Sequence, residues 1–233
     1  EGAANSTSSS GAPSEKKSKQ RKSTTSDATA ALTSTIRGNG ICVLTYVDDC
    51  IIVANSMKDI DRFVNSMKNG KENFILTDEG DIDKFLGIEI TSRENGEFEL
   101  SQPFLIQRIL NLLGIEDNGH DLPASIRLTP AAEKVLNRDL EGKPRKKSWG
   151  YRTAVGMLSY LQANSRPDIS MPVHQCARFC NDPKLSHEQA ITRIGRYLRH
   201  SKTRGIIYKP DPSNGLECRV DADFAGGWCQ TDP

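Results

Sequence analysis

The chain has 233 residues, of which 36% are hydrophobic, and its formal net charge is +1 at pH 7. This length suits one or two domains. The near-zero net charge excludes a strongly basic protein, so any surface that binds nucleic acid would have to come from a local cluster of Lys and Arg. No run reaches the roughly 18 apolar residues of a membrane helix, and no secretory signal is visible. We expect the six cysteines to be free thiols in a reducing, intracellular compartment.

Residues 1–40 differ in composition from the rest of the chain. Ser and Thr dominate, and Leu32 and Ile36 are the only large apolar residues. Such a stretch cannot bury enough surface to offset its ordering entropy, so we expect a disordered tail. The basic cluster at residues 16–22 could contact phosphates or act as a nuclear address, although a solvated charge run is the simpler interpretation. Because the sequence begins with Glu1, we interpret the chain as a fragment, a processed product or an open-ended gene model.

Residues 41–54 are the most distinctive stretch, because two short runs rich in Val and Ile flank Asp48 and Asp49. Such runs are typical of buried strands, which places both aspartates at the tight turn of a β-hairpin. Asp tolerates turn geometry and hydrogen-bonds its own backbone, so turn formation is one explanation. The other is chemical, since hard divalent cations such as Mg²⁺ prefer carboxylate oxygens on rigid elements. Spacing alone leaves both explanations open and slightly favours the turn.

After this hairpin, Ser56 can cap a helix that ends near Gly70, with apolar side chains in a helical stripe at Ile60, Phe63, Val64 and Met67. Residues 74–77 predict a strand. Residues 85–90 and 97–101 then predict a second hairpin that turns at Asn95-Gly96, a pair typical of type I′ turns. Gly87 would let another backbone approach closely, or it could mark a bulge.

The next segment predicts a helix over residues 103–113, ended by Gly114. Residues 116–148 are polar and contain three prolines, so we expect a loop with at most a short helix near Ala131 to Leu136. Within this loop, a second basic cluster comprises Lys143, Arg145, Lys146 and Lys147. It could touch a template backbone, but a mobile, solvated loop is the simpler interpretation.

Three further helices are expected, starting near Tyr151, near Ile169 and at the Ser186-His-Glu-Gln189 capping box. The third is amphipathic, and its cationic side, opposite the apolar one, carries Arg193, Arg196, Arg199 and His200. This cationic face could neutralise phosphates without reading bases, or it could simply be solvated. Residues 205–209 and 216–220 predict strands.

Tyr46-Val47-Asp48-Asp49 resembles the catalytic hairpin of reverse transcriptases, which carry Tyr-X-Asp-Asp between two hydrophobic strands of the palm. Further motifs resemble successive landmarks of the copia-type retrotransposon polyprotein, in the same order and at about the same spacing. They are Lys84-Phe-Leu-Gly-Ile-Glu-Ile90, Leu100-Ser-Gln102, Gly156-Met-Leu-Ser-Tyr-Leu161, Arg166-Pro-Asp-Ile169, Arg196-Tyr-Leu-Arg199 and Asp221-Ala-Asp-Phe-Ala-Gly226. The resemblance covers roughly residues 41–229, and its collinear motifs are far more specific than one Tyr-X-Asp-Asp string.

The resemblance implies an α+β fold in four parts. They are a disordered tail (1–40), a partial palm with both hairpins (41–102), a helical thumb and connection (103–204) and the truncated start of a ribonuclease H-like domain (205–233). Asp221 resembles the first metal ligand of that nuclease, with Asp223 as the alternative. Since the sequence stops before the later acidic residues, we expect no nuclease activity.

The resemblance also implies roles for individual residues. Asp48 would bind the catalytic Mg²⁺ (or Mn²⁺) and Asp49 would be a weaker or structural ligand. The residues expected beside the primer end are Tyr46 and Val47 from the turn and Phe85, Leu86 and Gly87 from the second hairpin. Arg193, Arg196 and Arg199 would lie near the nucleic acid.

The implied activity is RNA-directed DNA polymerisation. Its partners would be an RNA template, a DNA primer and deoxynucleoside triphosphates. Other parts of the parent polyprotein are further candidate partners, and no membrane is expected to be involved. The family also uses an Asp from an earlier palm strand, but we find no resemblance to that region in the tail, and Asp27 has no apolar strand around it. We therefore expect this chain to be inactive alone. The alternatives are a non-enzymatic nucleic-acid-binding remnant and a relic without a biochemical role.

Overall fold

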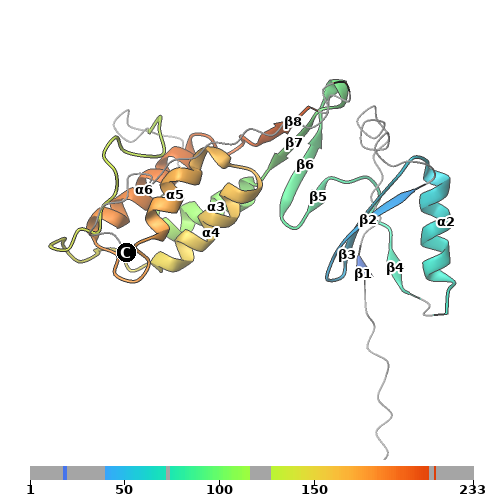
Figure 1. Cartoon of the computed structure of the whole chain (residues 1–233), viewed down its shortest axis with the longest axis horizontal. Helices are drawn as coiled ribbons and strands as arrows, with labels where there is room; N and C mark the ends of the chain where they lie inside the picture. The colour runs from blue at the N-terminus through green and yellow to red at the C-terminus, as the bar shows by residue number, and fades with distance from the viewer. Residues whose placement is uncertain (1–17, 20–39, 72–73, 116–126, 210–212, 214–233) are drawn as a thin grey trace, which may run out of the picture. The chain divides into compact units, whose positions relative to one another are not determined.

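The computed structural model describes residues 18–19, 40–71, 74–115, 127–209 and 213. The chain divides into two compact units, residues 1–82 and 83–233, and each is described by itself. Both units combine helices with a sheet, in agreement with the expected α+β class (Figure 1). None of the helices in these ranges is both long and apolar enough to cross a bilayer.

The sheet of the first unit is built on the predicted hairpin. β2 (Ile41–Tyr46) and β3 (Asp49–Ala54) pair antiparallel, without a break in register. Val and Ile suit this pleated, half-buried surface. Two short strands extend the sheet, β1 (Ser18–Lys19) and β4 (Leu76–Thr77), in the order β2-β3-β1-β4, and β1 is parallel to both of its neighbours.

Strand β1 corrects the expectation that all of residues 1–40 are disordered. Ser18–Lys19 pairs with β3 on one side and β4 on the other. Composition could not reveal this pairing, because the backbone groups of β1 find their partners far along the chain. The rest of the tail, including Asp27 and most of the basic cluster, lies outside the described residues.

The helix predicted after the hairpin is confirmed as α2 (Met57–Lys68). Ser56 caps it, since its side-chain oxygen accepts a hydrogen bond from the Asp59 backbone N–H at 3.3 Å. The apolar stripe faces the sheet, where Ile60 and Val64 form a small core with Ile52 and Ala54. The predicted apolar face of α2 therefore packs against β3 of the hairpin and supports it from one side.

The second unit has an antiparallel sheet of β5 (Lys84–Phe85), β6 (Ile88–Ser92), β7 (Phe98–Ser101) and β8 (Ile206–Tyr208), in that order. The single strand expected over residues 85–90 is wrong, because a tight turn at Leu86 and Gly87 interrupts it. The next connection is a 3-10 turn, η1 (Glu94–Gly96), rather than a two-residue turn.

Strand β8 also has a different place from the one we expected. It pairs with β7, which brings Ile206–Tyr208 into the sheet of the second unit rather than into a separate C-terminal part. The second hairpin likewise belongs to this unit, which begins after Ile82. Long-range strand pairing, which sequence patterns do not encode, sets both boundaries.

Four helices carry the core of the second unit: α3 (Pro103–Leu113), α4 (Tyr151–Asn164), α5 (Ser170–Ala177) and α6 (Leu185–Arg199), with a 3-10 turn η3 (Pro167–Ile169) before α5. Their buried Ile and Leu side chains form one cluster, as the helical periodicity predicted. The cap of α6 differs from the prediction: the Lys184 N–H donates to Nδ1 of the buried His187 at 2.8 Å. The described part of the loop before α4, residues 127–148, contains no helix.

A buried arginine ties the end of α4 to the end of α6. Arg166, only 2% exposed, donates to both Asp168 carboxylate oxygens at 3.0 and 2.8 Å and to the Ser201 carbonyl at 2.8 Å. The Tyr197 hydroxyl donates to Asp168 at 2.6 Å. Burial opposes ionisation of Asp168, but the hydrogen bonds from Arg166 and Tyr197 outweigh it and lower the pKa of this carboxyl below its usual value.

Replacing Arg166 with alanine should lower the free energy of unfolding by about 2–4 kcal/mol, because it removes several charged hydrogen bonds and leaves the buried Ser201 carbonyl without this donor. Urea unfolding followed by circular dichroism measures the loss. Arg93→Ala is the matched control: Arg93 is 44% exposed and pairs with Glu99 at the surface, so its removal should cost less than about 1 kcal/mol. Equal losses in the two variants would contradict the proposed role of Arg166.

The first hairpin contains a strained residue. Pairing of Tyr46 with Asp49 leaves only Val47 and Asp48 in the turn, and Val47 has a φ of +54°. A β-branched side chain rarely adopts positive φ, because its Cβ crowds the backbone. Such a conformation costs about 1–3 kcal/mol and is concentrated at functional sites in proteins.

Val47→Gly should therefore raise the stability of the first unit by about 1 kcal/mol, since relief of strain exceeds the added chain entropy of glycine. Val43→Gly, in the extended strand β2, should instead lower stability by about 1 kcal/mol. Denaturant midpoints of the two variants and the parent test this contrast. A loss of stability in Val47→Gly comparable to that in Val43→Gly would show that the turn is not strained.

Candidate active site

The Asp48 and Asp49 carboxylates project from successive positions at the tip of the first hairpin. Asp48 is exposed within the turn, whereas Asp49 is half-buried as the first residue of β3. The structure thus refines the prediction: one aspartate lies in the turn and the other in the strand. Adjacent carboxylates repel each other, and a divalent cation relieves this repulsion.

The strand beside this pair carries no further carboxylate. Lys19 of β1 is the backbone partner of Asp49, and Ser18 is the other residue of that strand. In the part of the chain that the structure describes, no group of three His, Cys, Asp or Glu side chains could hold a metal ion. Asp48 and Asp49 alone suit a hard cation that keeps several waters and takes further oxygens from substrate phosphates, as Mg²⁺ does.

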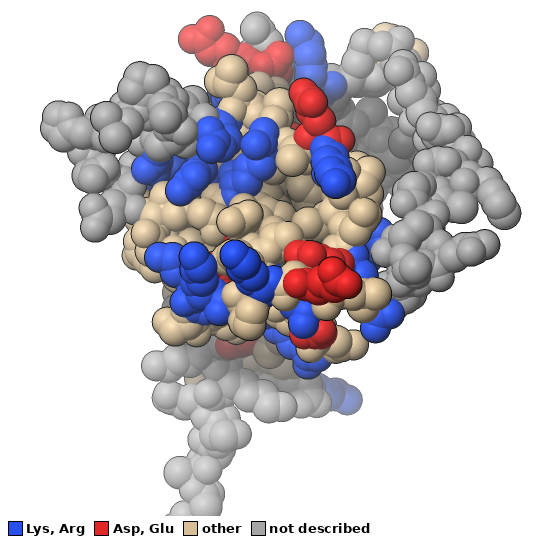
Figure 2. Space-filling model, turned by 90° about the vertical axis from the view of Figure 1, so that its left-hand side faces the viewer, with Lys and Arg blue, Asp and Glu red and all other residues tan. Residues whose placement is uncertain are grey.

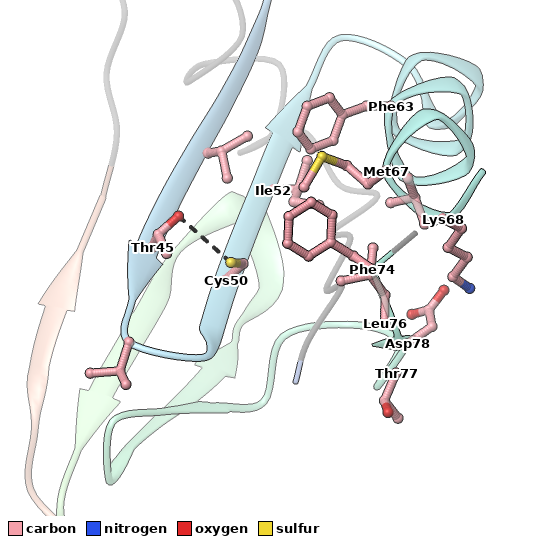
Figure 3. Close-up of a pocket in the computed structure, with 13 residues that line it drawn as sticks. Thr45, Cys50, Ile52, Phe63, Met67, Lys68, Phe74, Leu76, Thr77 and Asp78 are labelled. Atoms are coloured by element: carbon pink, nitrogen blue, oxygen red, sulfur yellow. Dashed lines mark hydrogen bonds between the residues drawn. The ribbon is translucent and has the colours of Figure 1, made fainter. Parts of the chain in front are cut away.

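A largely apolar cavity of about 350 Å³ reaches from the turn to α2. Figure 3 shows that its side chains come from the hairpin, from α2 and from the segment around β4, with Lys68 and Asp78 at one end. Val47 lines this cavity as well as forming the turn. The described residues therefore leave one side of the turn without close packing.

The second hairpin places its predicted residues in another tight turn. Phe85 pairs with Ile88, while Leu86 and Gly87 have φ values of +50° and +77°. The Tyr160 hydroxyl of α4 donates to the Leu86 carbonyl at 2.8 Å and holds this turn against the helices of its own unit. Sequence patterns do not reveal this contact, because the two residues are 74 positions apart along the chain.

The three arginines of α6 do not share one environment. Arg193 and Arg196 line a groove between α6 and the loop before α4, whereas Arg199 lies outside it, near His200. Arg193 donates to the Thr129 side chain of that loop at 2.8 Å. Asp221 and Asp223 lie outside the described residues.

Comparisons with known proteins identify a family and several relatives for this chain. Residues 17–125 match the family model described as "Reverse transcriptase (RNA-dependent DNA polymerase)". The match begins at β1, so part of the tail does resemble the polymerase region before the hairpin, contrary to our expectation. No solved structure matches the chain significantly.

Several curated relatives are named as transposon proteins. The chain is 34% identical over 82% of its length to the "Retrovirus-related Pol polyprotein from transposon RE1" of Arabidopsis thaliana, and 30% identical over 81% to that from transposon TNT 1-94 of Nicotiana tabacum. It is 28% identical over 78% to a "Putative transposon Ty5-1 protein" of Saccharomyces cerevisiae. The chain spans 12%, 14% and 56% of the lengths of these relatives. With the Tyr-Val-Asp-Asp hairpin inside the matched segment, the chain belongs to the reverse transcriptases of copia-type retrotransposons.

Proposed function

We propose that this chain is part of an RNA-directed DNA polymerase, which adds deoxynucleotides to the 3′ end of a DNA primer on an RNA template. The observation that carries the proposal is the pair Asp48 and Asp49 at a strained, tight hairpin turn within the segment that matches the family. These two carboxylates would hold Mg²⁺ (or Mn²⁺). When bound there, the ion would supply activation of the primer 3′-hydroxyl and stabilisation of the leaving pyrophosphate.

The other predicted residues have positioning roles in this proposal. Tyr46 and Val47, exposed at the turn, would flank the primer end. The Phe85, Leu86 and Gly87 turn would hold the primer terminus, and its tie to Tyr160 would fix it on the helical part of the protein. Asp221, or alternatively Asp223, would be the first ligand of a ribonuclease H-like site.

We further propose that this chain alone does not polymerise. The family's polymerase also uses an Asp from an earlier palm strand, whereas β1, the described strand that pairs with Asp49, consists of Ser18 and Lys19 and supplies no carboxylate. A second candidate function is nucleic-acid binding without catalysis, which the cations lining the groove of α6 favour.

Primer extension on a poly(rA)/oligo(dT) template with Mg²⁺ tests the proposed inactivity. The folded chain should give no incorporation above that of an Asp48→Ala, Asp49→Ala variant, because two carboxylates give the ion too few fixed ligands. Incorporation that disappears in the variant would mean that another part of the chain or a second copy completes the site.

Binding of Mn²⁺, followed by electron paramagnetic resonance, tests the metal site separately from catalysis. Weak binding should be lost in Asp48→Asn, Asp49→Asn but kept in the charge-matched Asp78→Asn, Asp81→Asn variant. A carboxylate introduced into β1 should strengthen binding about thirtyfold, since a unit negative charge about 4 Å from a divalent cation contributes about 2 kcal/mol in water.

Lys19→Asp tests this gain, because Lys19 is the backbone partner of Asp49. Equal Mn²⁺ affinity in the parent and in Asp48→Asn, Asp49→Asn would show that these carboxylates do not form the site.

A further inference from the structure

The second unit contains a groove of about 600 Å³ between α6 and the loop before α4. Its cationic side chains come from both walls, Arg193 and Arg196 from the helix and Arg127, Lys146 and Lys147 from the loop. Figure 2, which turns this end of the molecule to the viewer, shows Lys and Arg side chains gathered on either side of a band of uncharged surface. The positive charge is thus concentrated locally, although the whole chain has a net charge of only +1.

One acidic side chain, that of Glu188, lies in the lining of this groove, and the loop holds it in place. Glu188 is 4% exposed, and one of its carboxylate oxygens accepts hydrogen bonds from the backbone N–H groups of Lys146 and Lys147 at 3.2 and 2.9 Å. The same oxygen lies 3.4 Å from the Arg145 guanidinium. Because the Lys146 and Lys147 N–H groups and Arg145 hold this carboxylate, they partly offset its negative charge.

These contacts also fix the shape of the groove. Glu188 pins the backbone of the two lysines against α6, and the Leu185 N–H donates to the Lys143 carbonyl at 2.9 Å just beside it. On the other wall, Arg193 and Arg196 are three residues apart on α6, which puts their Cβ atoms about 5–6 Å from each other. The lysines and arginines are therefore presented together before any ligand arrives.

We propose that this groove binds the sugar-phosphate backbone of a nucleic acid, with Lys146, Lys147, Arg193 and Arg196 as the phosphate-contacting side chains and Glu188 as a positioning residue. The choice of nucleic acid as occupant rests on the proposed polymerase function. Lys and Arg side chains that contact phosphates, and not base edges, give an affinity that depends on the salt concentration and not on the nucleotide sequence. A groove with cations on both walls suits a strand-like polyanion, whereas a flat anionic membrane would contact only its rims.

Binding of a fluorescent RNA–DNA hybrid, followed by anisotropy over about 0.05–0.2 M salt, tests the proposal. Changing Lys146, Lys147, Arg193 and Arg196 together to alanine should weaken binding at least about tenfold and reduce the slope of log K against log salt concentration by about 3. The matched control removes three cations on or beside α2, Lys58, Arg62 and Lys71, together with the exposed Lys209 after β8, and should bind like the parent. Arg199→Ala, outside the groove, should also have no effect.

Glu188→Gln separates a preformed groove from general attraction between charges. This change makes the protein more positive, so charge counting alone predicts tighter binding. The proposed pinning predicts weaker binding, because the amide loses the ion pair with Arg145 and its charge-assisted hold on the loop. Circular dichroism of this variant and of the alanine variants checks that the helices remain folded.

Several outcomes would overturn the proposal: equal losses in the groove variant and the matched control, tighter binding by Glu188→Gln, or binding to vesicles of anionic lipid but not to the hybrid. Each leaves the Mn²⁺ site at Asp48 and Asp49 untouched. Failure of the groove proposal and failure of the polymerase proposal are therefore distinguishable.

Discussion

The antiparallel pairing of β2 with β3 constrains everything at the candidate active site. Because the register runs without a break to Tyr46 and Asp49, only two residues remain to reverse the chain. The first of them, Val47, must take a positive φ, and the second, Asp48, is left at the exposed tip. Asp49 then starts a strand that is buried further along against α2. The carboxylate pair is thus held on a rigid element at its base and open to solvent at its end.

Local patterns were sufficient for most of the fold. The stripe of apolar side chains predicted α2, and Ser56 was predicted as its cap. The same argument identified α3, α4 and α6, because the buried face of a helix appears as a periodic apolar pattern in its own sequence. Strand partners were not predictable in this way. Neither the insertion of Ser18–Lys19 between β3 and β4 nor the pairing of β8 with β7 leaves a local trace. The turn at Leu86 and Gly87 was missed because Leu is a poor predictor of positive φ.

For the candidate sites, the sequence was informative where the functional residues are adjacent in one short motif. Asp48 and Asp49 could be identified from the residues around them. The groove could not, since it joins a loop and a helix about forty residues apart through hydrogen bonds from backbone N–H groups to Glu188. Lys146 and Lys147 looked like solvated loop residues in the sequence, and Arg199 looked equivalent to Arg193. Only the packing of the loop on α6 separates them.

Strand β2 has a consequence for the behaviour of the protein in solution. In the described part of the chain it pairs on one side only, so the other side presents a row of backbone N–H and C=O groups at the edge of the sheet. Its six residues include no charged residue and no proline, and Leu44 and Tyr46 are more than half exposed. Proteins usually protect such edges with lysine, proline or a covering segment. Within the described residues, β2 therefore has the features of an edge strand to which another strand can be added.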